Sequence, residues 1–505
     1  MRSTFMGLET GKRGMFTQQT GLYTVGHNLG NENTLGFSRQ RVNMKTTTPF
    51  PGIGLSSGTS PGFIGTGVTA HSIERVRDVF VDRQYRQETN NFGYWESRSK
   101  AMEQIEDVMT VTSGAGLDKT LSLFWQSLQE LAKEPANLGV RRVVVERGVD
   151  TAAVFNNMHK QLTDIRSGLK NEIEMSTSAI NSIFKQIADL NDQIQRIEPN
   201  GYLPNDLYDS RDLLLDELST YLPIEVSYTK SGGNALKIAE GPVTVSIKTN
   251  GASIEVVKGK DFATMASDLT GAGVNDYFNN YTFAGTGVTG GTINHGELVQ
   301  GKGKMLSLVN SYGYAVDKGV YPEMLKNLND MAKAFADGFN AIHSAGYEFE
   351  KDGTGNTPQA GNFFAPTTGA GDIKVLDAIK NDPKKIGASN AANEEGNGKN
   401  ALLLAGMQSA TLTIDGTNTT LTSFYDSLIG KLGVDAEQAK RFTTTSAISA
   451  IAVEKRRASI SSVSKDEEMI NMIKFQQAYN ASARMITTID ETLDRIINGM
   501  GRVGQ

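Results

Sequence analysis

A heptad pattern of apolar residues runs along the C-terminal stretch from Met472 to Met500. Apolar side chains recur there at spacings of three and four, which is the pattern of a helix that packs along another helix. Only Ser482 interrupts the pattern. We expect a helix that needs a partner, because an apolar seam is unfavourable in water. Its predicted contact residues are Met472, Phe475, Tyr479, Ile486, Ile489, Leu493, Ile496 and Met500.

The N-terminal stretch carries a second repeat of seven residues. Glycine recurs at Gly7, Gly14 and Gly21, and larger apolar residues recur one position later. Glycine costs about 1 kcal/mol per helix position relative to alanine, so this helix needs packing to persist. The glycine row either lets a neighbouring backbone come close or is a tolerated exposed face. The predicted contact residues are Leu8, Met15, Leu22 and Leu29.

Long helices are predicted through the middle of the chain. Apolar residues spaced for a helix extend from Phe155 to Ile197, a length of roughly 65 Å at 1.5 Å per residue. Glu198-Pro199-Asn200-Gly201 ends this stretch. Another helix is expected from about Pro322 to Ile342, and helices resume near Thr422.

Short strands separate these helices. Alternating apolar residues predict strands at 224–228 and 243–247, and an Asn250-Gly251 turn would join the second of them to 254–256. A short strand followed by a helix is expected after a Gly-, Ser- and Pro-rich segment at 49–61.

This order of elements predicts a multidomain, mainly α fold that is elongated. It has long coiled-coil-like terminal and central helices and inserted β-rich domains. The simplest packing pairs the two ends of the chain and lets the β-rich middle project outward. The predicted divisions are 1–48, an N-terminal helix of an inner core; 49–90, a linker with irregular and short β structure; 91–221, the first part of a helical domain; 222–304, a β-rich insertion; 305–346, the middle part of the helical domain; 347–419, a second mixed β-rich region; 420–462, the C-terminal part of the helical domain; and 463–505, the C-terminal helix of the inner core.

Composition argues against some classes of function and partner. The chain has 505 residues, a formal net charge of −6 and a pI near 5.6, so we expect no attraction to nucleic acid. No apolar run approaches the ~18 residues of a membrane span, so no membrane partner is expected. The first residues lack the apolar core of a signal peptide, and cysteine is absent. These features fit a reducing compartment, or export in an unfolded state by a route without the usual signal.

No motif predicts catalysis, a cofactor or a metal site. Gly285 to Gly290 reads GTGVTG, but the following residues are not helical as a nucleotide site requires. The five histidines are not spaced as metal ligands. The acidic run Asp466-Glu467-Glu468 lies at a helix start, where negative charge is favourable. We therefore expect a protein that is not an enzyme.

The two ends together resemble bacterial flagellar axial proteins. The stretches are GHNLGNENTLGFSRQRV near the N-terminus and DEEMINMIKFQQAYNASARMITTIDETLD near the C-terminus. The chain is most similar to the proteins of the junction between hook and filament, and YDSRDLLLDELSTYLPIEVSY, with Asp209, Arg211 and Asp212, supports this. The residues on the terminal patterns are Asn28, Asn31, Asn33, Gly36, Phe37, Arg39 and Gln40, and then Glu468, Met469, Asn471, Gln476, Ala478, Tyr479, Ala483, Thr487 and Asp490.

The resemblance implies a structural subunit that polymerises and connects hook to filament, and that filament assembly and motility require. It implies export by the flagellar type III apparatus and a place outside the cell. The implied partners are other copies of this chain, the hook protein, a second junction protein toward the filament, and an export chaperone on the C-terminal helix. The alternatives are another axial protein such as hook, rod or flagellin, a filament-displayed adhesin or enzyme, and a cytoplasmic coiled-coil scaffold.

Overall fold

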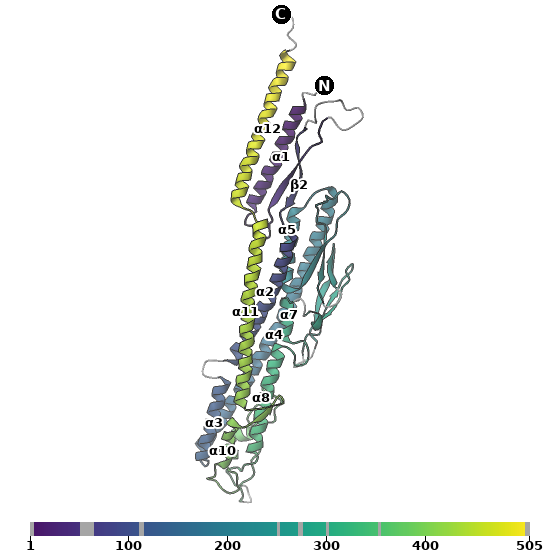
Figure 1. The fold of residues 1–505 in the computed structure, drawn as a ribbon. Coiled ribbons are helices and arrows are strands. Elements are labelled where there is room, and N and C mark those ends of the chain that lie inside the picture. Colours follow the sequence, from purple (N-terminus) through teal and green to yellow (C-terminus); the bar gives the residue numbers. More distant parts are fainter. Residues whose placement is uncertain are drawn as a thin grey trace.

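The protein is an elongated molecule with both chain ends at one extremity (Figure 1). The computed structural model describes residues 5–50, 65–110, 116–249, 253–270, 276–298, 302–351 and 355–499. Helices run along the long axis, and small antiparallel sheets lie beside them (Figure 1). The predicted mainly α, elongated fold with inserted β structure is confirmed.

The terminal module contains the two ends of the chain. Helices α1 (Phe5–Gly30) and α12 (Lys465–Gly499) lie side by side (Figure 1). The antiparallel pair β1 (Gln40–Thr46) and β2 (Val68–Arg75) packs against α1, where the Thr17 hydroxyl donates to the Val68 carbonyl at 3.1 Å. The predicted pairing of the two ends is therefore confirmed.

A bundle of long helices, here called the rod, forms the middle of the molecule. Its longest member, α4 (Leu138–Ile197), has 60 residues and is roughly 90 Å long at 1.5 Å per residue. It begins earlier than predicted, because the Asn137 carboxamide accepts from the backbone N–H of Gly139 at 2.9 Å and caps the helix. It ends as predicted, with Gly201 in the left-handed region at φ 85°. The other helices of the rod are α2 (Val79–Met109), α5 (Asn205–Tyr221), α7 (Lys304–Tyr312), α8 (Val320–His343) and α11 (Leu421–Ser461).

The far end of the rod, here called the tip, has an aromatic core. Phe124 packs against Phe339 and Phe363, with ring centroids 5.3 and 6.0 Å apart. The sequence predicted a mixed β-rich region at 347–419, whereas the strands described there are two short ones joined in a hairpin. Glycine and asparagine are frequent in this region and favour loops. The elements of the tip are α3 (Leu117–Lys133), α9 (Asp377–Asn381), α10 (Lys399–Gly406), β10 (Leu412–Ile414) and β11 (Thr417–Thr419).

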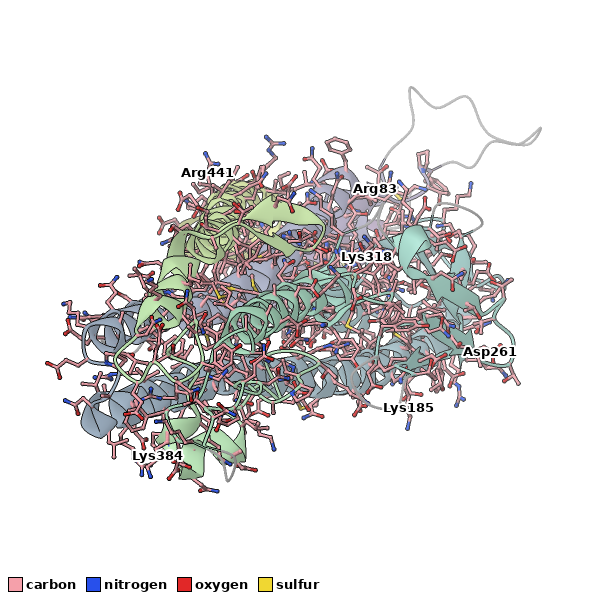
Figure 2. All side chains as sticks on the ribbon, turned by 90° about the horizontal axis from the view of Figure 1, so that it is seen from below. Arg83, Lys185, Asp261, Lys318, Lys384 and Arg441 are labelled. Atoms are coloured by element: carbon pink, nitrogen blue, oxygen red, sulfur yellow. The ribbon has the colours of Figure 1, made fainter. Side chains whose placement is uncertain are left out.

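Two antiparallel sheets flank one side of the rod, in the order β3-β4-β5-β6 and β7-β8-β9. Asparagines of α4 fix their position: the Asn191 amide donates to the Val243 carbonyl at 3.1 Å, and the Asn181 amide donates to the Met265 carbonyl at 2.9 Å. In the view along the long axis, this part lies to one side, where Asp261 is labelled (Figure 2). The elements are β3 (Ile224–Tyr228), β4 (Val243–Ile247), β5 (Ile254–Lys258), β6 (Asp261–Phe262), β7 (Thr264–Asp268), β8 (Asn280–Ala284), β9 (Gly291–Asn294) and α6 (His295–Leu298).

The predicted strands β3, β4 and β5 are confirmed, with Ile247 paired to Ile254 across β4 and β5. The predicted Asn250-Gly251 turn lies outside the described residues, as does most of the segment at 49–61. The predicted division boundaries stay predictions.

Candidate assembly interface

The glycine row of α1 lies against the apolar seam of α12. A Cβ atom on Gly11 would lie 2.9 Å from Cγ1 of Ile486, and one on Gly21 would lie 3.0 Å from the Phe475 ring. These distances are too short for a side chain, so the two helices touch through glycine. Of the two readings of the glycine row, the structure supports close approach of a neighbouring helix.

The pairing across this seam is antiparallel and regular. Gly7 faces Ile489, Gly14 faces Ser482, and Gly21 faces Phe475. The facing positions are seven residues apart on both helices. A large side chain of α12 therefore fits against a glycine, except at Ser482, where both residues are small.

The predicted contact residues fall into four groups. Phe475, Ile486 and Ile489 face glycines of α1, and Ile496 is 43% exposed. Met500 lies outside the described residues. The remaining seven are half-buried in a single copy: Leu8, Met15, Leu22, Leu29, Met472, Tyr479 and Leu493.

A polar cluster lies at the end of the seam where α12 begins, next to the rod. We call Asn28, Arg39, Gln40 and Glu468 the clasp. The Asn28 amide donates to Oε2 of Glu468 at 3.1 Å and to the Gln40 carbonyl at 2.8 Å, while Nε of Arg39 donates to Oε1 of Glu468 at 2.9 Å. Arg39 also pairs with Glu467 at 2.6 Å. The acidic run at the start of α12 thus binds an arginine, a role that the sequence did not indicate.

The terminal module is tied to the rod next to the clasp. The backbone N–H of Ser38 donates to Oδ2 of Asp209 at 3.0 Å, and Nε2 of Gln40 donates to Oδ1 of Asp206 at 3.0 Å. The backbone N–H of Arg39 donates to the Ser461 carbonyl at 2.8 Å, which links the same segment to the end of α11. Residues 38–40 therefore contact α5, α11 and α12 together.

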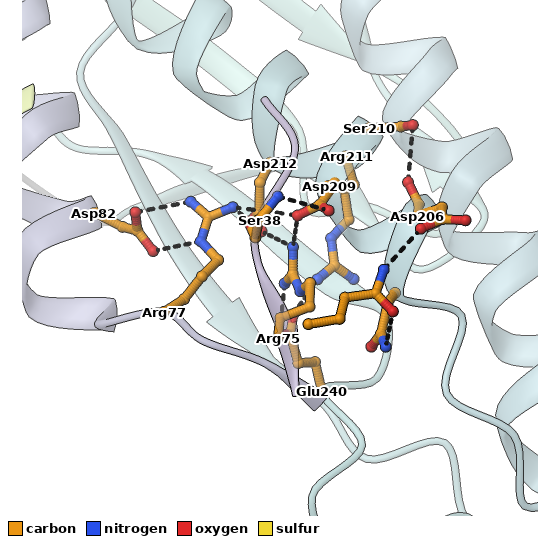
Figure 3. Close-up of polar contacts among 12 residues, drawn as sticks. Ser38, Arg75, Arg77, Asp82, Asp206, Asp209, Ser210, Arg211, Asp212 and Glu240 are labelled. Atoms are coloured by element: carbon orange, nitrogen blue, oxygen red, sulfur yellow. Dashed lines mark hydrogen bonds and ion pairs between the residues drawn. The ribbon is translucent and has the colours of Figure 1, made fainter. Parts of the chain in front are cut away.

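A buried ion network joins the module to the rod (Figure 3). Nη1 of Arg75 lies 2.7 Å from Asp209 and 2.9 Å from Asp212, and Nη1 of Arg77 lies 2.9 Å from Asp212. The network links the end of β2 to α5, α2 and α11. Its five cations and five anions are Arg75, Arg77, Arg86, Arg211, Arg457, Asp82, Asp209, Asp212, Asp216 and Glu240.

Asp212 is the centre of this network. Burial favours its neutral form and would raise its pKa, but the guanidinium groups of Arg77, Arg75, Arg211 and Arg86 outweigh burial and hold the pKa well below its usual range. The Asp212 side chain is only 4% exposed. Its charge is therefore kept over the whole ordinary pH range.

The motifs considered for nucleotide or metal binding form no such site among the described residues. Gly285 to Gly290 forms the connection between strands β8 and β9, so no helix follows the glycines. Among the described residues, no group of histidine, aspartate and glutamate is arranged to hold a metal ion. No described helix is long and apolar enough to cross a membrane.

Most of the basic half of the ion network was missed by sequence reasoning. Asp209, Arg211 and Asp212 were marked by the family resemblance, but Arg75, Arg77 and Arg86 were not. Their signal is a run of arginines across a strand end and a helix start in an acidic chain. Such a run predicts carboxylate partners without saying where in the chain they are.

Comparison with known proteins finds similarity over the whole chain. Residues 102–364 match the family described as the flagellar hook-associated protein FlgK helical domain, and residues 457–499 match the flagellar basal body rod FlgEFG protein C-terminal family. The chain is 41% identical over 522 residues to flagellar hook-associated protein 1 of Bacillus subtilis (strain 168), with 100% of each chain covered.

Two more distant similarities agree with these. The chain is 24% identical over 572 residues to flagellar hook-associated protein 1 of Salmonella typhimurium, covering 96% of this chain and 98% of the relative. The solved structure of the flagellar hook junction protein FlgK from Burkholderia pseudomallei shares the fold, with a TM-score of 0.60 and 14% identity, over 75% of this chain and 100% of that one.

Proposed function

Because the chain belongs to the flagellar hook-associated protein 1 family, we propose that its paired terminal helices assemble with those of other copies at the junction between hook and filament. The protein is a structural component of the bacterial flagellum that connects hook to filament, and it acts outside the cell after export. Membership of this family decides against the alternatives that the chain is a hook protein, a flagellar rod protein or a flagellin.

The observation that carries the proposal is the incomplete cover of the terminal seam. Met472, Tyr479 and Leu493 follow the heptad pattern but stay half-buried when α12 has only α1 beside it. On the outer side of α12, Ile470 and Ile473 are 65% and 56% exposed. Apolar surface of this extent favours a further helix partner, which copies of the chain supply.

The rod and the tip support a mechanical role in this proposal. The continuous α4 and the buried ion network give a stiff body fixed to the terminal module. No reaction is required for such a role, and we propose that the protein is not an enzyme. The proposed partners are other copies of the chain, the hook protein, the second junction protein toward the filament, and an export chaperone that holds α12 before assembly.

The experiment is complementation of a strain that lacks its own gene for this protein. Without the protein, electron microscopy should show hooks without filaments, and flagellin should appear in the medium. The full chain should restore filaments. A chain with Ile470→Asp and Ile473→Asp should be exported yet fail to restore them, while Glu491→Gln, which alters an exposed residue of the same helix, should restore them. Filaments at the normal level with the double variant would refute the assembly surface on α12.

A further inference from the structure

The seam between α1 and α12 does not by itself fix how the helices align. Its glycines at 7, 14 and 21 face Ile489, Ser482 and Phe475, and both sets repeat every seven residues. A slip of seven residues, about 10 Å at 1.5 Å per residue, would bring Ser482 opposite Gly7 or Gly21. Glycine has no side chain that could clash with a residue of α12 in a slipped alignment. The seam therefore offers several similar alignments.

The clasp offers one alignment only. Asn28 occupies the next position of the glycine repeat and is 1% exposed, and its partner Glu468 is 2% exposed. After a slip of seven residues in one direction, Phe475 would take the place of Glu468 opposite Asn28; in the other direction no residue of α12, which begins at Lys465, would face Asn28. Both Asn28 and Glu468 would then lose their shared hydrogen bond, which is costly for buried polar groups.

We propose that Asn28 and Glu468, braced by Arg39, set the register in which α12 pairs with α1. A single buried polar residue fixes the register of coiled coils in the same way, at some expense of stability. The two residues position the helices and bind no ligand. This inference concerns a single copy, so it holds or fails independently of the proposed junction role.

Two chain connections bear on the register. Three residues, 462–464, join α11 to α12, so a slip of α12 also requires these residues or the adjoining helix ends to rearrange. Nine residues, 31–39, join α1 to β1, and at about 3.3 Å per residue they can span roughly 30 Å. The bond from Thr17 to Val68 fixes α1 to the β1–β2 pair, but it does not hold α12. The clasp is thus the buried polar tie between α12 and the rest of the terminal module, beside the Lys465–Glu32 ion pair.

Cysteine pairs can report the register, because the chain contains no cysteine. A Cβ atom on Gly14 would lie 3.6 Å from Cβ of Ser482, within the range for a disulfide, so Gly14→Cys with Ser482→Cys reports the native register. Gly7→Cys with Ser482→Cys, and Gly21→Cys with Ser482→Cys, report the two slipped registers. Oxidation of dilute full-length protein, followed by non-reducing gels and peptide mapping, separates intramolecular from intermolecular bonds.

With the clasp intact, only the native pair should cross-link within one chain. Replacing the two hydrogen-bonded residues Asn28 and Glu468 by leucine should raise intramolecular cross-linking of at least one slipped pair by about tenfold or more. Glu468→Gln keeps an acceptor for Asn28 and should retain the native register. Glu32→Gln, which removes the exposed Lys465–Glu32 ion pair at the same end of the seam, serves as the matched control and should not slip.

Two results would overturn the proposal. One is a leucine variant that keeps its helical circular dichroism and still cross-links only through the native pair. The other is slipping in Glu468→Gln equal to that in the leucine variant. If the leucine variant loses its helical signal, Glu468→Ala in the same reporters decides: slipped cross-links support the proposal, and native cross-links alone refute it.

Discussion

Gly11 and Ile486 touch so closely that no side chain fits between them: the Cβ position of Gly11 lies 2.9 Å from Cγ1 of Ile486. Gly26, on the same helix, has open space at its Cβ position. The two glycines have the same intrinsic cost in a helix, so their substitution separates helix propensity from packing.

Gly11→Leu should therefore weaken the pairing of α1 with α12 by about 1–3 kcal/mol, since overpacking forces side chains or backbone to move. Gly26→Leu should stabilise α1 by up to about 1 kcal/mol, because leucine is the better helix former. Hydrogen exchange of the α1 amides measures both. Equal protection in the two variants would contradict close packing at Gly11.

Asp212→Asn should destabilise the protein by about 3–5 kcal/mol, because it leaves buried guanidinium groups without their carboxylate. Asp212 lies 2.9 Å from nitrogens of both Arg75 and Arg77. Asp337→Asn is the control, since Asp337 pairs with Lys333 on an exposed helix face, where such pairs contribute little to stability. Urea unfolding of the two variants measures the difference. Similar midpoints would mean that the network adds nothing to stability.

Stability should decrease as the pH is lowered, because of His343. This ring is fully buried: its Nδ1 lies 2.7 Å from the Gly361 carbonyl, and its Nε2 accepts from the Gly387 N–H at 3.0 Å. Burial, aided by the nearby Arg141, lowers the pKa of His343 to about 4, against the favourable bond to Gly361. The folded state therefore binds fewer protons than the unfolded state below the ordinary value of 6.5.

The contribution of His343 is thus complete above that value and is lost as the pH falls toward 4. The loss should approach about 1.4 kcal/mol per pH unit, or about 3 kcal/mol in all. His343→Gln can keep one donor and one acceptor without titrating, so the variant should lose this part of the slope. Urea unfolding from pH 4.5 to 7 tests it, and parallel curves for the two proteins would refute the assignment.

Charges placed in the seam should block assembly. Ile486→Asp with Leu493→Asp puts two carboxylates on the face of α12 that packs on α1, where burial without partners costs several kcal/mol. Cells with this variant should release flagellin into the medium. Filaments at the normal level would contradict the prediction.

Removing residues 464–505 should have the same effect on filaments and leave the rod folded with an unchanged thermal transition. The rod core does not include α12, and the long helices pack against one another. In the free protein α12 packs on α1 alone, so we expect protease to cut it more readily than α4. Equal resistance of the two helices would mean that α12 already has its full cover within one chain.

Long helices were predictable because their burial is periodic. The residues that predicted α4, such as Phe155, Leu162 and Ile187, are fully buried. The pairing of the chain ends was predictable for the same reason. In α1, however, two rows repeat every seven residues one position apart, and apolarity alone favours the leucine row over the glycine row. Which row meets α12 depends on how closely the backbones approach, and sequence does not state that distance.

The clasp and the ion network depend on partners that are far apart in the chain. Asn28 and Glu468 are 440 positions apart, and Arg75 and Asp209 are 134 apart. Local periodicity carries no information about such pairs. The terminal resemblance marked Asn28, Arg39, Gln40 and Glu468 separately, and the structure brings these four together.

The antiparallel pairing of the two ends has a consequence for the order of folding. Helix α1 is the first helix of the chain to be made, and its partner α12 is the last. Any chain that stops before Lys465 exposes the whole glycine row to water and lacks the carboxylates that Arg39 binds. The rod can form from such a fragment, but the terminal module cannot. The seam can therefore close only in a chain that contains both α1 and α12.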